Sequence, residues 1–280
     1  GKDISQFGYR IQVSPLDCTG CGNCADVCPA PGKALIMRPA DQMIEQEADN
    51  WEYAMTIKPK YQYTNWKTLK GSQFRPPLFE FNGACPGCGE TPYLRLLTQL
   101  FGERMIIANA TGCSSIYTAS APSMAYTVNA DGHGPAWANS LFEDNAEYGF
   151  GMWLGVSQIR HRLAGLMKDL LNSDVDASLA EAFRAWLENM YDGEGSVEPS
   201  NRIVDLLAKM DLKSNPALAE IWEKRAYLIK KSQWIIGGDG WAYDIGYGGL
   251  DQVLSLGEDV NILVMDTEVY SNTGGQSSKS

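Results

Sequence analysis

The sequence contains no apolar stretch that approaches the roughly 20 residues needed to cross a bilayer. Positive charge is also scarce, because 23 lysines and arginines face 34 aspartates and glutamates, for a net charge of −11. This balance argues against nucleic acid or an anionic membrane surface as a partner. The first residues, GKDISQFGYR, lack the apolar core of a signal peptide. We therefore expect a cytoplasmic protein that binds neither membrane nor nucleic acid.

Seven cysteines fall into two groups by their spacing. The first group is C-x2-C-x2-C-x3-C followed at once by Pro29, which is the bacterial ferredoxin spacing for cubane iron–sulfur clusters. In that arrangement the fourth cysteine ligates a different cluster from the first three. We therefore expect Cys18, Cys21 and Cys24 to hold one [4Fe–4S] cluster and Cys28 to serve another.

The second group is Cys85 and Cys88, a C-x2-C pair, with Cys113 downstream in a Gly-Cys-Ser context. A C-x2-C pair alone is as consistent with zinc as with iron and sulfur. Cys18, Cys21 and Cys24 are one ligand short of a cubane cluster, and Cys85, Cys88 and Cys113 are also one short of four. We therefore expect these residues to be an internal portion of a longer polypeptide, with the other ligands outside it.

Hydrophobic patterning predicts the secondary structure. Short strands are expected at 8–13 and 34–37, as in half of a small ferredoxin, and residues 39–80 are expected to be irregular. Beyond residue 83, buried strands alternate with helices, which predicts an α/β fold with a doubly wound parallel sheet. The strands are expected at 104–110, 232–238 and 260–267, and the helices at 92–102, 141–172 and 245–257.

Polar and glycine-rich segments follow the predicted strands. Gly238-Asp239-Gly240 comes directly after one strand, and the segment from Thr267 to Asn272 follows the next. Open α/β sheets bind ligands at the carboxyl ends of their strands. Glycine lets the backbone approach phosphate, and a carboxylate with neutral oxygens suits Mg²⁺. A lone G-D-G is more often a plain turn, but the surrounding strands and helix favour a site here.

The G-D-G sequence, followed 26 residues later by a polar ligand and an asparagine, resembles the thiamine diphosphate motif. Thr267 stands where many such enzymes carry asparagine. The stretches GACPGCGETPYLRLL, NATGCSS, GGDGWAYDIGYGGLDQVLS and DTEVYSNTGGQSSKS resemble the pyruvate:ferredoxin (flavodoxin) oxidoreductases, and the resemblance covers nearly the whole chain. It implies a partial ferredoxin-like [4Fe–4S] domain at 1–48, a connector at 49–82, and a thiamine diphosphate- and Mg²⁺-binding domain at 83–280, with a helical insertion at about 173–231.

The resemblance also implies roles for individual residues. The expected Mg²⁺ ligands are the side chains of Asp239 and Thr267 and the carbonyl of Val269. Asn272 is the expected catalytic residue, in contact with the substrate-derived group. The remaining expected cofactor-binding residues are Glu90, Cys113, Gly238, Gly240, Trp241, Glu268, Tyr270 and Ser271. The cluster nearest the thiamine would be held by Cys85, Cys88 and Cys113, the next by Cys18, Cys21 and Cys24, and the most distant by Cys28 together with ligands outside the chain.

The implied reaction is the oxidative decarboxylation of pyruvate to acetyl-CoA and carbon dioxide, with single electrons passing through three [4Fe–4S] clusters to ferredoxin or flavodoxin. A homodimer of a longer chain is expected. Two alternatives remain open: a related enzyme for 2-oxoglutarate or a branched-chain 2-oxoacid, and a non-catalytic electron-transfer module. For Glu90, a charge at a helix N-terminus is the simpler structural interpretation.

Overall fold

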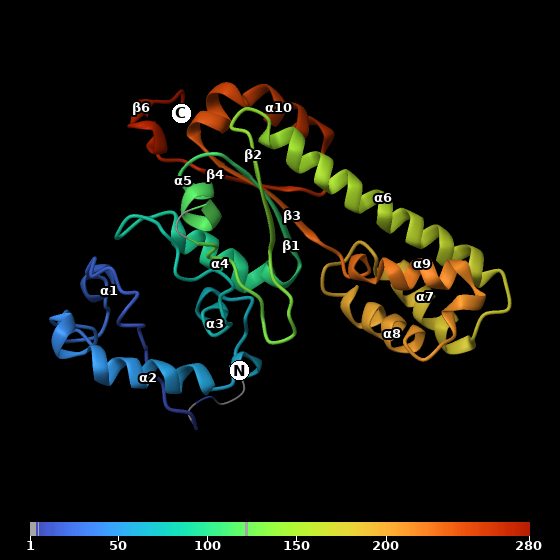
Figure 1. Cartoon of the computed structure of the whole chain (residues 1–280), viewed down its shortest axis with the longest axis horizontal. Coiled ribbons are helices and arrows are strands. Elements are labelled where there is room, and N and C mark those ends of the chain that lie inside the picture. Colours follow the sequence, from blue (N-terminus) through green and yellow to red (C-terminus); the bar gives the residue numbers. More distant parts are fainter. Residues whose placement is uncertain (1–3, 5, 121–122) are drawn as a thin grey trace. The chain divides into compact units, whose positions relative to one another are not determined.

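The computed structural model of the chain describes residues 4, 6–120 and 123–280, which form two compact units (Figure 1). The N-terminal unit comprises Gly1–Glu103 and Ile116–Gly134, and the sheet unit comprises Arg104–Ser115 and Pro135–Ser280. No helix in the described part of the chain is both long and apolar enough to span a membrane.

The N-terminal unit is built from short helices and irregular backbone. Its elements are α1 (Asn23–Asp26), η1 (Ala40–Gln42), α2 (Ile44–Thr56), η2 (Tyr61–Tyr63), α3 (Leu69–Ser72), α4 (Thr91–Phe101) and the π-helical turn η4 (Ile116–Ser120). The helix expected at 92–102 is confirmed as α4. It begins with Thr91-Pro92, where the missing proline N–H costs no helical hydrogen bond.

Two expectations for this unit are wrong. Residues 8–13 and 34–37 are not strands, and no described segment pairs with either of them. An unpaired strand has no ladder to stabilise it. The stretch 39–80 is not wholly irregular, because α2 occupies thirteen of its residues. This helix has acidic residues in its first turn, which suit the positive end of the helix dipole.

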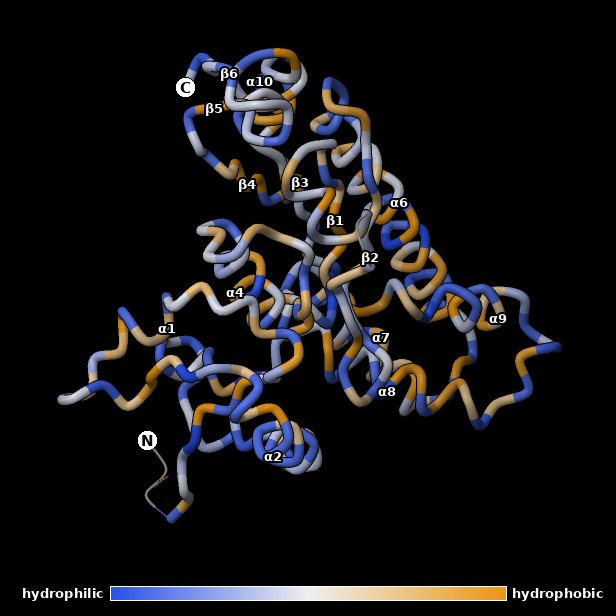
Figure 2. The backbone as a smooth tube through the Cα atoms, turned by 60° about the vertical axis from the view of Figure 1, so that its left-hand side comes forward, coloured by the Kyte–Doolittle hydropathy of each residue, from blue (hydrophilic) through white to orange (hydrophobic). Residues whose placement is uncertain are grey.

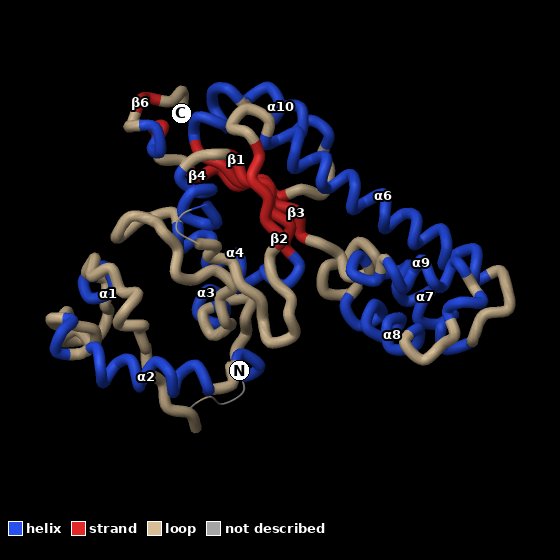
Figure 3. The backbone as a smooth tube through the Cα atoms, viewed as in Figure 1, coloured by secondary structure: helices blue, strands red, loops and turns tan. Residues whose placement is uncertain are grey.

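The sheet unit contains four parallel strands in the order β2-β1-β3-β4, drawn in red in Figure 3. They are β1 (Met105–Ala110), β2 (Ala136–Ser140), β3 (Ser232–Gly238) and β4 (Asn261–Met265). A short antiparallel pair, β5 (Val269–Tyr270) and β6 (Gln276–Ser277), follows. The predicted doubly wound parallel sheet and its three predicted strands are confirmed. Figure 2 shows apolar residues along β1 and β4.

Helix α6 (Asn145–Leu171) covers one face of this sheet near its start. Gly149 allows the close approach, since a Cβ at that position would lie 2.5 Å from Cγ1 of Ile235 and 3.0 Å from Cβ of Ala108. After β3, the π-helical turn η7 (Gly240–Ile245) and helix α10 (Tyr247–Leu256) return the chain to β4. The helices predicted at 141–172 and 245–257 are confirmed.

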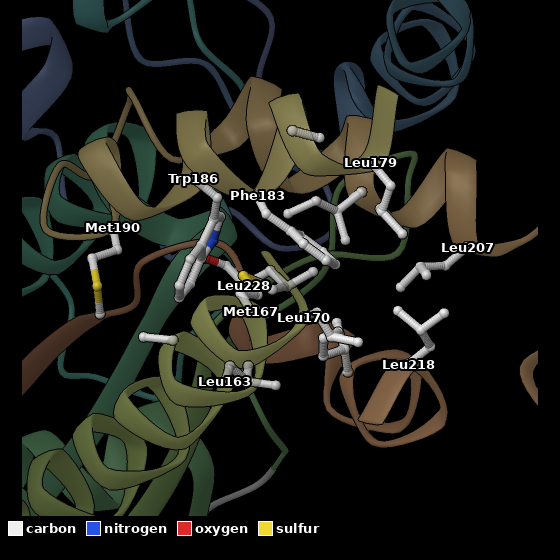
Figure 4. Close-up of a cluster of buried hydrophobic side chains, with 14 residues drawn as sticks. Leu163, Met167, Leu170, Leu179, Phe183, Trp186, Met190, Leu207, Leu218 and Leu228 are labelled. Atoms are coloured by element: carbon white, nitrogen blue, oxygen red, sulfur yellow. The ribbon is translucent and has the colours of Figure 1, made fainter. Parts of the chain in front are cut away.

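Beyond the sheet, α6 continues into a small helical bundle with α7 (Ala177–Asn189), α8 (Val197–Leu207) and α9 (Pro216–Glu223) (Figure 1). The bundle has its own apolar core, in which Leu163, Phe183 and Trp186 are fully buried (Figure 4). Arg160 is also buried there, and its guanidinium donates to the carbonyl of Leu228 at 2.6 Å. The domain boundaries expected at 48 and 82 remain predictions; the first lies within α2.

Candidate active site

The sheet has a topological switch point between β1 and β3. Strand β1 leads to β2 on one side, whereas β3 leads to β4 on the other, so the chain leaves these neighbouring strands in opposite directions. Such a switch point, at the carboxyl ends of the strands, is where open α/β sheets bind ligands. Cys113 follows β1 and Asp239 follows β3, so both lie at this switch point.

Asp239 connects two loops at this edge, which we call the β3 loop (residues 239–246) and the β4 loop (residues 266–272). The Asp239 side chain is 2% exposed. Its carboxylate accepts backbone N–H groups from Thr267 at 3.0 Å and from Glu268 at 2.8 Å. These donors satisfy a buried charge that would otherwise be costly.

Three oxygens from the expected cation ligands lie together. The hydroxyl oxygen of Thr267 is 3.0 Å from Oδ2 of Asp239 and 3.1 Å from the carbonyl oxygen of Val269. One carboxylate and two neutral oxygens are the donor set that Mg²⁺ takes in proteins, with water and phosphate completing the octahedron. The residues present therefore fit a divalent cation, and Thr267 and Glu268 leave the site exposed on one side.

The β4 loop has an unusual backbone at Glu268, whose φ is +62°. A non-glycine residue in this left-handed region is uncommon, and such residues cluster at functional sites. This conformation accompanies the inward turn of the Thr267 and Glu268 N–H groups toward Asp239. Glu268 is exposed, and it contacts Asp239 through its backbone N–H.

The two glycines of G-D-G differ in their surroundings. A Cβ on Gly240 would lie 2.1 Å from Cε1 of Tyr270 and 2.5 Å from Cζ of Phe142. A Cβ on Gly238 would meet only the carbonyl oxygen of Met265, at 3.8 Å. Open space beside Gly238 fits the approach of a diphosphate, whereas Gly240 is needed for packing between the two loops.

Trp241 is fully buried, and its ring packs where a Cβ on Gly237 or on Gly246 would stand. Its indole N–H has no hydrogen-bond partner among the described residues. The side chain therefore serves the core of the sheet unit, together with Ile235 and Ala146. Any contact of Trp241 with a diphosphate has to come from its backbone.

Cys113 lies against the far end of the β4 loop. The hydroxyl of Ser271 donates to the sulfur of Cys113 at 3.3 Å, and that sulfur is 3.9 Å from Oδ1 of Asn272. The structure therefore brings together three of the expected cofactor-binding residues. Cys113 begins the short helix α5 (Cys113–Ser115).

A buried polar network that the sequence did not reveal supports the Cys113 loop. Asn109 is fully buried and donates to the hydroxyl of Ser114 at 2.9 Å and to the carbonyl of Ile236 at 3.2 Å. Asn145 donates to the same carbonyl at 3.0 Å and accepts from Ser140 at 2.7 Å. This network fixes the ends of β1, β2 and β3 relative to one another.

Glu90 lies in the N-terminal unit, directly before α4. Its carboxylate accepts a hydrogen bond from the hydroxyl of Tyr117 at 2.9 Å. Burial and, next, the charge of Glu90 raise the pKa of Tyr117, so this hydroxyl keeps its proton. Glu90 is the N-cap residue of α4; its side chain makes no capping hydrogen bond, and its backbone carbonyl accepts from the N–H of Tyr93 at 3.1 Å.

The two cysteine segments of the N-terminal unit approach each other. Cys85 and Cys88 form a turn closed by a bond from the N–H of Cys88 to the carbonyl of Cys85 at 3.0 Å. Gly87, inside this turn, has a φ of +77°, and a Cβ there would lie 3.2 Å from Nδ2 of Asn23. Asn23 stands next to Cys24, so the structure places the two C-x2-C motifs near each other.

Cys28 is surrounded by backbone donors. The N–H of Ala34 lies 3.3 Å from its sulfur. Hydrogen bonds from the N–H groups of Ala30 and, next, Leu35 lower the pKa of the thiol. Such donors favour the thiolate that binds iron, so this donor set fits an iron–sulfur ligand.

Within the described ranges, no three histidine, cysteine or carboxylate side chains converge on one point as a metal-binding group would. Cys18, Cys21 and Cys85 are exposed outside helices and strands, and Cys24 is exposed on the short helix α1. The grouping of the cysteines around individual clusters therefore remains a prediction from their spacing. The same holds for the roles of Glu90, Trp241 and Asn272.

The fold and site define an α/β protein with a parallel sheet, whose chain also carries a ferredoxin-like cysteine segment. Comparison with known families supports this class, because residues 11–30 match the 4Fe-4S binding domain. The prediction that the first cysteine run binds a [4Fe–4S] cluster is thereby confirmed at the level of the family.

Comparison with curated proteins gives the particular relatives. The chain is 58% identical over 279 residues to the pyruvate-flavodoxin oxidoreductase of Klebsiella pneumoniae, a match that covers 100% of the chain and 24% of that protein. It is 56% identical over 283 residues to the pyruvate:ferredoxin oxidoreductase of Moorella thermoacetica, again covering 100% and 24%. The pyruvate dehydrogenase (NADP+), mitochondrial, of Euglena gracilis is 50% identical over 279 residues, covering 99% and 15%.

The resemblance to the pyruvate:ferredoxin (flavodoxin) oxidoreductases is thus confirmed along the full length of the chain. The chain spans about a quarter of the length of the first of these curated relatives.

Proposed function

We propose that this chain carries the cofactor-binding crevice and several iron–sulfur ligands of an enzyme that oxidatively decarboxylates pyruvate to acetyl-CoA and carbon dioxide. The observation that carries the proposal is the group of oxygens from Asp239, Thr267 and Val269 at the switch point of the sheet. A site of this kind suits Mg²⁺ with the diphosphate of thiamine. The names of the relatives supply pyruvate as the substrate.

Thiamine diphosphate, when bound, supplies a carbon nucleophile for the 2-oxo carbon and an acceptor for the electron pair released with carbon dioxide. The residues of this chain would bind and orient it. Asp239 and Thr267 would hold the cation, and the open backbone at Gly238 would admit the diphosphate. Asn272, in the β4 loop, would donate from its amide to an oxygen of the substrate-derived group.

Electrons would leave through cysteine-bound clusters, each of which accepts one electron at a time. Cys113 lies beside Ser271 and Asn272 at the reactive end of the crevice, so a cluster bound there would be the first acceptor. Within the N-terminal unit, Asn23 lies close to Gly87, so the two cysteine segments are near neighbours. This proximity favours electron transfer between the clusters that they would hold.

The final acceptor is a separate question, because relatives named for flavodoxin, for ferredoxin and for NADP+ all match this chain over nearly its whole length. We propose that the chain serves the steps that such enzymes have in common, and that ferredoxin or flavodoxin takes the electrons here. Coenzyme A as acetyl acceptor and a homodimer of the complete protein belong to the same proposal.

The test uses the full-length protein. Pyruvate with coenzyme A should bleach the visible iron–sulfur absorption of the wild type, and Asp239→Asn should abolish the bleaching while the clusters remain. Bleaching by 2-oxoglutarate but not by pyruvate would favour the related 2-oxoacid enzyme. Intact clusters that no 2-oxoacid reduces would favour an electron-transfer module.

A further inference from the structure

Two tyrosine–aspartate hydrogen bonds cross between the loops that supply the cation oxygens. Tyr243, in the β3 loop, donates from its hydroxyl to Oδ2 of Asp266 at 2.9 Å. Tyr270, in the β4 loop, donates in the opposite direction, to Oδ2 of Asp244 at 2.7 Å. Each loop therefore contributes one tyrosine and one aspartate, and we call this reciprocal pair the tyrosine clasp.

Charge strengthens both bonds. The hydrogen bond from Tyr243 is the main cause that lowers the pKa of Asp266, and the bond from Tyr270 is the main cause that lowers the pKa of Asp244. The same bonds raise the pKa of each tyrosine, so the hydroxyls remain protonated donors. Hydrogen bonds to a carboxylate are roughly twice as strong as neutral ones.

The clasp brackets the cation ligands of the β4 loop. Asp266 directly precedes Thr267, and Tyr270 directly follows Val269. The loop is therefore anchored to the β3 loop immediately before its first ligand and immediately after its second. The anchors restrict the separation between these two oxygens and the carboxylate of Asp239, which begins the β3 loop.

We infer that Tyr243 and Tyr270 are positioning residues that set the geometry of the cation site and so its preference for Mg²⁺ over Ca²⁺. This inference rests on the proposed function. Mg²⁺ requires a nearly ideal octahedron with oxygens about 2.0–2.1 Å away, whereas Ca²⁺ accepts irregular ligands at about 2.3–2.6 Å. A rigid pair of loops therefore favours Mg²⁺, and a loosened pair loses Mg²⁺ affinity first.

The two bonds act on the same pair of loops, so they support each other. While one remains, the loops stay joined there and through the bonds of Asp239 to Thr267 and Glu268. Removing both should therefore weaken the site by more than the product of the single effects. Tyrosine-to-phenylalanine changes suit this test, because the Tyr270 ring would keep its place against Phe142 and Gly240.

The experiment uses the full-length protein freed of metal and given thiamine diphosphate. Mn²⁺ affinity is measured from the electron paramagnetic resonance signal of the free ion, and Mg²⁺ and Ca²⁺ affinities are measured by competition. We expect Tyr243→Phe and Tyr270→Phe each to lower the Mg²⁺ affinity by less than about threefold. The double variant should lower the Mg²⁺ affinity tenfold or more. Ca²⁺ affinity should change less than threefold throughout.

Matched controls separate positioning from general damage. Tyr148→Phe changes an exposed tyrosine on α6 and should leave both affinities as they are. Asp244→Asn keeps an oxygen that can accept from Tyr270, so it should lose less Mg²⁺ affinity than Asp244→Ala.

If the double variant lost equal Mg²⁺ and Ca²⁺ affinity, or lost no affinity at all, the positioning role of the tyrosine clasp would be overturned. The proposed function would still be supported as long as cation binding depended on Asp239. If Asp239→Asn left Mn²⁺ affinity unchanged, the cation would not bind at this site. That result would overturn both the clasp and the proposed function.

Discussion

Replacing Gly240 by alanine tests whether the packing between the β3 and β4 loops maintains the cation site. The added Cβ would stand 2.1 Å from Cε1 of Tyr270 and 2.5 Å from Cζ of Phe142. Non-bonded carbons sit at roughly 3.5–4.0 Å, so the Tyr270 ring would have to move by about 1.4 Å. Gly240 does not have a positive φ, so the requirement is steric rather than conformational.

Movement of the Tyr270 ring would also displace the oxygens of the cation site. Tyr270 is held at its hydroxyl by Asp244 and is directly bonded to Val269, whose carbonyl is one of the three oxygens. Overpacking of this kind costs typically about 1–3 kcal/mol. If this free energy is lost from cation binding, the cation affinity should decrease by about 5-fold to 150-fold.

Gly238→Ala is the matched control within the same motif. Its added Cβ would meet only the carbonyl of Met265, at 3.8 Å, which is an ordinary contact. Mn²⁺ affinity of the metal-free full-length protein, measured without thiamine diphosphate, should therefore stay within about twofold of the wild type. Equal losses from Gly238→Ala and Gly240→Ala would refute the steric argument, as would an unchanged Gly240→Ala protein.

Three further predictions concern pH, the helical core and the clusters. The hydrogen bond from Tyr243 is the main cause that lowers the pKa of Asp266 in the folded protein. The ionised Asp266 therefore stabilises the fold above the ordinary aspartate pKa of about 3.9, and this stabilisation is lost as the pH falls through the pKa that Asp266 has in the folded protein. Urea unfolding should accordingly show Tyr243→Phe to be less stable than the wild type at pH 7. The difference should shrink as the pH falls below the ordinary aspartate pKa, and a difference that stays constant would contradict this sign. Trp186→Phe removes a buried 2.9 Å hydrogen bond from the indole N–H to a backbone carbonyl, so it should lower the free energy of unfolding by about 1–3 kcal/mol. Trp222→Phe is the control; this residue is only partly buried against the same core, so the change should lower the free energy of unfolding less. Cys24→Ser and Cys28→Ser should each remove a different cluster signal in paramagnetic resonance of the full-length protein, and loss of the same signal from both would contradict the ferredoxin assignment.

The two central strands were predictable because nearly all of their residues are buried. Strand β1 begins with the apolar run MIIA, and β3 contains the apolar run WII after a polar start, which suits a central parallel strand. Strand β2 was missed because AWANS carries little β-branched or apolar content. It is a strand because it pairs with residues Ile106 to Ala110 of β1. That pairing arises only in the tertiary structure, so the local sequence does not predict it.

Part of the site was predictable, because residues that follow neighbouring parallel strands lie close together at one edge of the sheet. Asp239, Thr267 and Cys113 each follow a strand of one parallel sheet, so their approach follows from the topology. The tyrosine clasp and the buried amide of Asn109 have no spacing signature, because each joins side chains that only the folded loops bring together. Residues that position a site are harder to find in a sequence than the residues that bind a ligand.

The arrangement of the β4 loop couples the cation site to the cysteine that follows β1. Thr267 and Val269, at one end of the loop, face Asp239, while Ser271, at the other end, contacts Cys113 at 3.3 Å. Only a few residues separate the two ends, and the tyrosine clasp anchors the loop on both sides of the cation ligands. We therefore expect a shift of this loop at the cation site to disturb the contact between Ser271 and the sulfur as well. In the proposed enzyme, the loop that orients the cofactor would also fix the distance over which the first electron leaves.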